Sequence, residues 1–288
     1  MPEFTKHMLI DARETRYRRR MNLRVTTKEQ AIEFVNDVGF CCLFPIQGVE
    51  MPSLWQAVAG RVLKTTNKHS GYEIERTWGW KDDSLDKRQW FYGKLIRGKA
   101  TLVSLDFLPN FYALSENYGD YEHDYLEEYH TGQLTAEAKQ IYEALLKNGA
   151  LDAIRLRREA RMSSEANKGR FEKALTDLQA GLKVLPVGIA QAGAWRYAFI
   201  YELLPRWYPD VPAKAQKIGR AEARRAILDQ YLRNVIGTTL QSAARVFGWT
   251  LAETKQVAES LAAEGRAELE VKVAGIRELM MVTAKAEG

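Results

Sequence analysis

A cluster of acidic and histidine side chains is the first place in this sequence where metal or acid–base chemistry could be sought. It lies in the segment LPNFYALSENYGDYEHDYLEEYHTG, and its members are Glu122, His123, Asp124, Glu127, Glu128 and His130. No His-Glu-x-x-His spacing is present, and four tyrosines between positions 118 and 129 are interleaved with the acids. This pattern is typical of a helix with one solvated and one apolar face, so we expect no metal site here.

Other signatures of catalysis are absent from the sequence. The chain has no glycine-rich phosphate loop, no Gly-x-Ser-x-Gly elbow and no Cys/His metal spacing, which argues against nucleotide hydrolases, serine hydrolases and zinc enzymes. Its two cysteines, Cys41 and Cys42, are adjacent. They cannot form a CxxC redox site or an unstrained metal pair, so we expect buried, reduced thiols. We expect no metal, nucleotide or organic cofactor.

Basic side chains, which can contact phosphate, gather in two segments. Residues 155–173 contain seven lysines and arginines against three acids, and residues 214–233 contain six against two. The net charge of +5 and the pI near 9.0 favour an acidic partner only modestly in a chain of 288 residues. Each cluster is either a nucleic-acid contact or a solvated helix face.

The elements that position the first basic cluster lie in residues 132–207. Three helical patterns come first: one begins at the N-cap Thr135, one at the N-cap Asp152, and one runs from about Ser164 to Leu182. Two strand patterns follow, KVLPVGI and WRYAFIY, joined by the turn AQAG. Three helices and a hairpin predict a helix-turn-helix with a wing.

The same order of patterns recurs in residues 214–288. Helical stripes begin at Arg220 and in LQSAARVFG, and Thr250 with Glu253 predicts a capping box for a third helix. AELEVKVAG and ELMMVT then read as strands. An internal repeat of this size indicates one supersecondary unit used twice. Residues 208–213, which include YPDVP, are predicted as a proline-rich linker between the two copies.

The N-terminal region, residues 25–131, resembles a third copy with insertions. Thr27 and Gln30 predict a capped helix, FCCLFPI a short strand, and Ser53 the start of another helix. GYEIERTWGW alternates like a strand, SLDKRQWFYGKLIRG looks helical, and ATLVSL looks like a strand. Residues 1–24 are rich in arginine and form either a basic arm that contacts phosphate or a disordered terminus, of which the second is favoured. No apolar run approaches the roughly 20 residues of a membrane helix, so we expect a cytoplasmic protein of two or three domains.

The segments FVNDVGFCCLFPI, WRYAFIYELLPRWYPD and IGRAEARRAILDQYLRNVIGTTLQSAARVFGW are similar to the winged-helix family that includes the bacterial DNA glycosylases AlkZ and YcaQ. The similarity runs from about Thr26 to Val273 and is one of pattern, strongest in the last third. It implies an α+β, mainly helical fold in which tandem winged helices form a curved, C-shaped arrangement around a duplex. It also implies double-stranded DNA as the partner and no metal or organic cofactor.

The usual catalytic residues of that family are missing in this chain. Active members carry Gln-x-Gln or Gln-x-Asp after the first helix, where these groups position water and stabilise the positive charge that develops on the sugar. Aligning Gly39 with the family's glycine at the helix end places Cys42 and Phe44 at the two positions, and neither side chain can do this. Gln47 and Trp55 complete the candidate pocket. The chain is therefore a DNA-binding protein, a glycosylase with a rebuilt active site, or a transcription regulator.

The candidate DNA contacts follow from the predicted elements. The start of the third helix and the wing are the contact surfaces of a winged helix, and a helix N-terminus favours phosphate. The candidates are Asn167, Lys168, Arg170, Lys173, Arg157, Arg158, Arg88, Lys94, Arg97, Lys99, Arg220 and Arg224. The tryptophans near Lys94 are expected in the core rather than stacked on bases.

Overall fold

The computed structural model describes residues 4–63, 71–193 and 196–284. The fold mixes α and β structure, is about half helical and contains small antiparallel sheets. Contacts divide the chain into two compact units, Met1–Trp80 with Arg220–Gly288, and Lys81–Gly219. Among the described residues, no helix is both long enough and apolar enough to cross a membrane.

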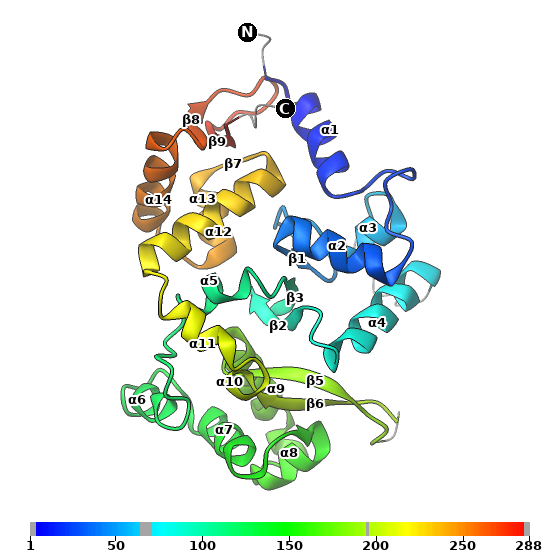
Figure 1. Ribbon diagram of the computed structural model, residues 1–288, viewed down its shortest axis with the longest axis vertical. Coiled ribbons are helices and arrows are strands. Elements are labelled where there is room, and N and C mark those ends of the chain that lie inside the picture. The colour runs from blue at the N-terminus through cyan, green and yellow to red at the C-terminus, as the bar shows by residue number, and fades with distance from the viewer. Residues whose placement is uncertain (1–3, 64–70, 194–195, 285–288) are drawn as a thin grey trace. The chain divides into compact units, whose positions relative to one another are not determined.

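The central group of elements in unit Lys81–Gly219 follows the predicted order of three helices and a hairpin (Figure 1). The elements are α7 (Ala136–Asn148), β4 (Leu151–Asp152), α8 (Ala153–Glu159), the 3₁₀ turn η1 (Glu165–Asn167), α9 (Lys168–Ala180), β5 (Val184–Ala190) and β6 (Ala198–Leu203). Both predicted N-caps are confirmed. Thr135 Oγ1 accepts from the Ala138 N–H at 3.2 Å, and Asp152 Oδ1 accepts from the N–H groups of Ile154 and Arg155 at 3.0 Å. Trp195, where the second strand was predicted to begin, lies outside the described residues.

A three-stranded antiparallel sheet closes this group, in the order β4-β6-β5. Strand β4 was not predicted, because its two residues are too few to form an alternating pattern. The core beneath the sheet is apolar and includes the fully buried Ile141, Leu145, Leu156, Leu178 and Leu203. Within α9, Phe171, Ala174, Leu175 and Leu178 are buried at helical spacing, so this helix is fixed with its basic side outward.

The same order of elements occurs in the other unit. It comprises α12 (Arg220–Val235), β7 (Gly237–Thr238), α13 (Leu240–Phe247), α14 (Leu251–Ala263), β8 (Ala267–Val271) and β9 (Met280–Thr283). The sheet order β7-β9-β8 matches that of β4-β6-β5, with the short strand beside the second strand of the hairpin. The predicted capping box is confirmed, because Thr250 and Glu253 exchange both reciprocal hydrogen bonds.

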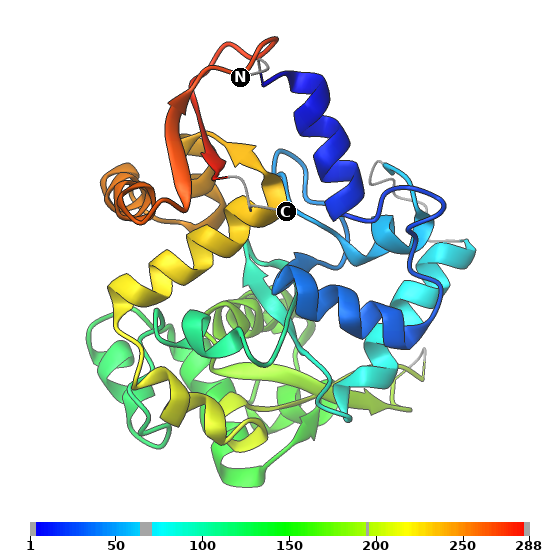
Figure 2. The ribbon, with the colours of Figure 1, turned by 45° about the horizontal axis from the view of Figure 1, so that its top comes forward.

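The predicted N-terminal arm, residues 1–24, contains a helix. Helix α1 (Lys6–Arg16) is capped by Thr5 and packs Leu9 against the C-terminal hairpin, so the first helix and the last hairpin are neighbours (Figure 2). Arg13 donates to the carbonyl oxygens of Val235 and Gly237 at 2.7 and 2.6 Å. Arg13 therefore stabilises the fold. The favoured prediction of a disordered terminus is wrong for residues Lys6–Arg16.

The elements after α1 confirm three predictions, and one predicted strand proves to be a helix. As expected, α2 (Lys28–Val38) begins after Thr27, β1 spans Phe40–Cys42, and α3 (Leu54–Ala59) follows Ser53. The strand predicted over GYEIERTWGW is instead part of helix α4 (Tyr72–Leu85). Its buried face includes Thr77, Lys81 and Ser84, and such polar residues concealed the helical period in the sequence.

The helix predicted over SLDKRQWFYGKLIRG is also wrong beyond Leu85. Residues Phe91–Ile96 form strand β2, which pairs with the correctly predicted strand β3 (Lys99–Val103). The apolar run Trp90, Phe91 and Tyr92 is buried continuously, as in a strand covered on both faces. The order α2, β1, α3, α4, β2, β3 therefore repeats that of the two clear copies.

The expected linker, residues 208–213, contains the start of a helix instead. Helix α11 (Asp210–Ala215) follows α10 (Leu204–Trp207) and packs on α5 (Leu108–Tyr112), with Pro212 buried. A proline in the first turn of a helix removes no intrahelical hydrogen bond, so the two prolines start this helix rather than break it. The Tyr208 hydroxyl also donates to the Trp90 carbonyl at 2.9 Å.

Candidate nucleic-acid interface

The loop after β1 folds back onto the strand and brings the candidate pocket residues together. The Cys42 N–H donates to the Pro52 carbonyl at 3.0 Å, and the Trp55 N–H donates to the Leu43 carbonyl at 3.1 Å. The ring of Phe44 packs edge-on against Trp55, with ring centroids 5.5 Å apart. The loop is held by backbone hydrogen bonds and aromatic packing.

The two positions that would carry catalytic amides are apolar in the fold as well as in the sequence. Cys42 is 1% exposed, with its Sγ 4.0 Å from Met51 Sδ, and burial raises the pKa of its thiol to about 12. A buried, protonated thiol is a poor nucleophile and cannot stabilise a cation. The ring of Phe44 also meets that of Trp78, at 5.8 Å.

Gln47 and Trp55 differ in their access to solvent. Gln47 lies on the exposed part of the loop. Trp55 is 8% exposed, and its indole N–H has no hydrogen-bond partner among the described residues. Of the four candidate pocket residues, Gln47 alone presents a polar group to solvent.

The cations predicted at the start of α9 are exposed, as a DNA contact requires. Lys168, Arg170 and Lys173 form ion pairs of 3.7, 3.9 and 2.6 Å with Glu165, Glu137 and Asp177. Ion pairs between exposed side chains are worth about 0–1 kcal/mol, so a phosphate can displace them. Asn167 is the N-cap residue and makes no side-chain capping bond.

Two neighbouring arginines of α8 have different roles. Arg157 is half-buried, donates through Nη2 to the Ser164 carbonyl at 3.0 Å, and lies 5.8 Å from the ring of Phe171. These contacts hold the connection between α8 and α9, so Arg157 is structural. Arg158 is exposed and contacts Glu159 at 3.4 Å.

The β2–β3 hairpin carries three candidate cations. Burial lowers the pKa of Lys94, and the charge of Lys99 on the paired strand lowers it further. Arg97 occupies the turn with φ of 56°. Arg88, which precedes β2, stacks its guanidinium 4.3 Å from the ring of Trp207. Nearby like charges disfavour each other, and an anion bound between them relieves this repulsion.

In the other unit, several arginines of α12, which form part of the second basic cluster, pair with acids. Arg224 pairs with Glu253 at 2.6 Å and Arg225 with Glu264 at 3.4 Å, which joins α12 to α14 and its C-terminal end. Arg220 is the first residue of α12 and is exposed. Of the two candidates in this cluster, Arg220 is the more accessible.

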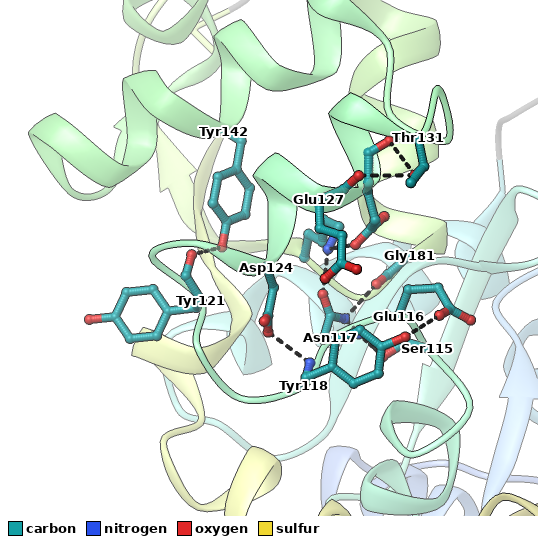
Figure 3. Close-up of polar contacts among 12 residues, drawn as sticks. Ser115, Glu116, Asn117, Tyr118, Tyr121, Asp124, Glu127, Thr131, Tyr142 and Gly181 are labelled. Carbon is teal, nitrogen blue, oxygen red and sulfur yellow. Dashed lines mark hydrogen bonds and ion pairs between the residues drawn. The ribbon is translucent and has the colours of Figure 1, made fainter.

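Side chains and backbone groups of the acidic segment make hydrogen bonds that stabilise the fold (Figure 3). Asp124, the first residue of α6 (Asp124–His130), accepts from the Tyr118 and Gly119 N–H groups at 2.7 and 3.0 Å. The Tyr142 hydroxyl donates to the Tyr121 carbonyl at 2.7 Å. Within the described residues, no group of three or more His, Cys, Asp and Glu side chains is arranged to hold a metal ion.

The aromatic and basic side chains of residues 78–99 differ widely in their burial. Lys81 is 1% exposed, pairs with Asp82 at 2.5 Å and lies 4.5 Å from the ring of Phe199, so it is unavailable to phosphate. Trp90 is in the core as predicted, at 1% exposed, whereas Trp78 is 39% exposed. The β5–β6 hairpin, which carries Phe199, packs on the end of α4 and helps to bury Lys81. No signal in the sequence indicates this contact.

Comparisons with known proteins agree on one family. The model of the AlkZ-related family matches residues 25–248. Streptomyces sahachiroi DNA glycosylase AlkZ has a similar structure, with a TM-score of 0.58 and 14% identity over 96% of this chain and 70% of that one. At this identity the likeness is one of fold. No curated protein matches the chain significantly.

Proposed function

The chain belongs to the AlkZ-related family, and from this premise we propose that it is a DNA-binding protein that contacts duplex DNA through exposed basic side chains. The family match over residues 25–248 is the observation that carries the proposal, because a relative in structure is a DNA glycosylase. The exposed cations at the start of α9 and on the β2–β3 hairpin are the candidate contacts.

We further propose that the repeated groups of elements are winged helices. Each has a helix, a short strand, two helices and a hairpin, in that order. In the central copy, α9 would enter a groove, and the β5–β6 hairpin would be the wing. Lys168 and Lys173 would then contact backbone phosphates, which provide affinity without sequence information.

The proposed activity is binding rather than base excision by the usual route. That route requires amide or carboxylate groups near the anomeric carbon, and here Cys42 is a buried thiol and Phe44 part of an aromatic cluster. A rebuilt active site is the alternative, and the exposed amide of Gln47 is the observation in its favour.

Salt dependence tests the binding proposal. With about six phosphate contacts, affinity for duplex DNA should fall roughly a thousandfold between 50 and 200 mM salt. Fluorescence anisotropy with a labelled duplex measures this directly. Binding that is independent of salt, or no binding to any duplex, would refute the proposal.

A lesion assay separates binding from catalysis. The protein is incubated with duplexes that contain alkylated or crosslinked bases, and alkali then converts any abasic site to a strand break. We expect no breaks, with an active DNA glycosylase as the positive control. Breaks that disappear in a Gln47→Ala variant would instead establish the rebuilt active site.

A further inference from the structure

A basic cavity lies between helices α7 and α8, next to each other in the central group (Figure 1). Its volume is about 560 Å³, and its charged lining residues are Lys139, Glu143, Lys147, Arg158, Glu159 and Arg161. Arg158 and Arg161 belong to the first basic cluster of the sequence, and of this set only Arg158 is among the predicted DNA contacts. The other cations are separated in sequence, and α7 and α8 bring them together only when they pack.

The cavity has a cationic excess that the protein itself does not neutralise. Four cations face two carboxylates, which leaves a net charge of +2. Lys139 pairs with Glu143 at 2.8 Å and Arg158 with Glu159 at 3.4 Å. Lys147 and Arg161 form no ion pair with any residue in the described part of the chain. Both are exposed, so two unpaired cations border one cavity.

The C-terminal end of α7 also borders the cavity, and its negative dipole end would oppose an anion. The protein offsets this with Arg206, whose guanidinium donates to the carbonyls of Leu145 and Leu146 at 2.9 and 2.6 Å. Asn148 donates to the Ala144 carbonyl at 2.7 Å. These bonds occupy the carbonyl groups that would otherwise repel a bound anion.

The lining indicates which kind of anion fits. Small-molecule sites are mostly apolar and aromatic, whereas this cavity has no aromatic side chain and only two apolar residues, Ala144 and Ala160. A nucleobase would find no stacking surface here. Phosphate groups need only cations and hydrogen-bond donors, which Lys147 and Arg161 supply.

We propose that this cavity binds phosphates of the DNA backbone, with Lys147 and Arg161 as the contact residues. The inference rests on the proposed DNA-binding function and adds to it a contact surface on α7 and α8. Lys139 and Arg158 support the site by holding its two carboxylates in ion pairs.

The test compares two variants with equal changes in charge. Lys147→Ala/Arg161→Ala removes the two unpaired cations, and Lys255→Ala/Lys272→Ala removes two exposed cations of the other unit. Losing two phosphate contacts should lower the magnitude of the slope of log K against log salt by about 1.8. We expect this in the first variant alone, and retention of the slope in Lys147→Arg/Arg161→Lys. Thermal unfolding followed by circular dichroism checks that all variants fold.

The outcomes distinguish this inference from the function on which it rests. If the wild-type protein binds DNA and both alanine variants have equal slopes, this cavity is not a DNA contact and the inference fails alone. If the wild-type protein binds no duplex, the proposed function fails. Tripolyphosphate, titrated at constant ionic strength, probes a free phosphate ligand. Its tight binding to the wild type, lost in Lys147→Ala/Arg161→Ala while DNA binding is unchanged, would overturn the assignment to DNA.

Discussion

Single residues in this protein show how burial decides chemistry. Cys42 and Lys183 carry reactive groups, yet both are almost fully buried, at 1% and 4% exposed. Lys183 is held by Glu128 and by Asn117 Oδ1, which accepts from its ammonium at 2.5 Å. These contacts make Lys183 part of the structure, as burial makes Cys42 part of the core.

Cys42 should be inert in the folded protein. Because burial raises the pKa of its thiol to about 12, almost no thiolate exists at pH 8, and the side chain is inaccessible. A coloured thiol reagent should modify neither Cys41 nor Cys42 until the protein unfolds. A Ser163→Cys variant, at an exposed position, should react at once. Equal rates for the native and variant proteins would contradict the buried geometry.

Removing Glu128 should leave a buried charge without its partner. Glu128→Gln should lower the free energy of unfolding by about 3–5 kcal/mol, because the Lys183 ammonium loses its counter-ion. Chemical denaturation measures this change. The exposed neighbour serves as a control, since Glu127→Gln should change stability by less than about 0.5 kcal/mol. Adding Lys183→Met to Glu128→Gln should recover part of the loss, and a strictly additive result would contradict the pairing.

Helices in this protein are positioned by contacts far away in sequence. Helix α1 is joined to the C-terminal hairpin by Leu9 and to the end of α12 by Arg13. Helix α4 buries polar side chains, and α11 begins with prolines that resemble a break. At this scale, what surrounds an element determines its role more than its own composition.

The docking of α1 can be tested with two adjacent residues on different faces of the helix. Leu9 is 2% exposed and packs on Val273, Met280 and Val282, whereas Ile10 is 41% exposed. Leu9→Ala should lower the free energy of unfolding by about 2–5 kcal/mol, because it removes buried methyl groups and leaves a cavity. Ile10→Ala should change it by less than about 0.5 kcal/mol. Similar losses in both variants, measured by denaturation, would show that α1 does not dock by this face.

The whole molecule should lose stability at alkaline pH. Burial raises the pKa of many tyrosines, among them Tyr17, Tyr92, Tyr201 and Tyr231, above the ordinary value of about 10. The folded state therefore keeps protons that the unfolded chain loses above pH 10. The contribution of these protonated tyrosines to the free energy of unfolding is complete below pH 10 and is lost as the pH rises through their raised pKa values.

Tyr17→Phe isolates one such group. The Tyr17 hydroxyl is buried without a hydrogen-bond partner among the described residues, so the variant keeps the packing and removes only the ionisation. Above pH 10, the slope of the free energy of unfolding against pH should become shallower by about 1.4 kcal/mol per unit. Denaturation at several pH values checks this. A wild-type free energy of unfolding that is constant from pH 9 to 11 would contradict the raised pKa values of the buried tyrosines.

The sequence by itself determined the caps and the apolar periods of the two clear copies, and so the order of their helices and hairpins, although not the two-residue strands β4 and β7. Thr135, Asp152 and Thr250 predicted helix starts because capping involves residues only two or three positions apart. It also placed apolar residues at positions 42 and 44. The tertiary structure alone decided that α4 is a helix, that Lys81 is buried, and that Lys147 and Arg161 border one cavity. Those features depend on packing between segments that are far apart in the sequence, and a local pattern of side chains does not contain the energy of that packing.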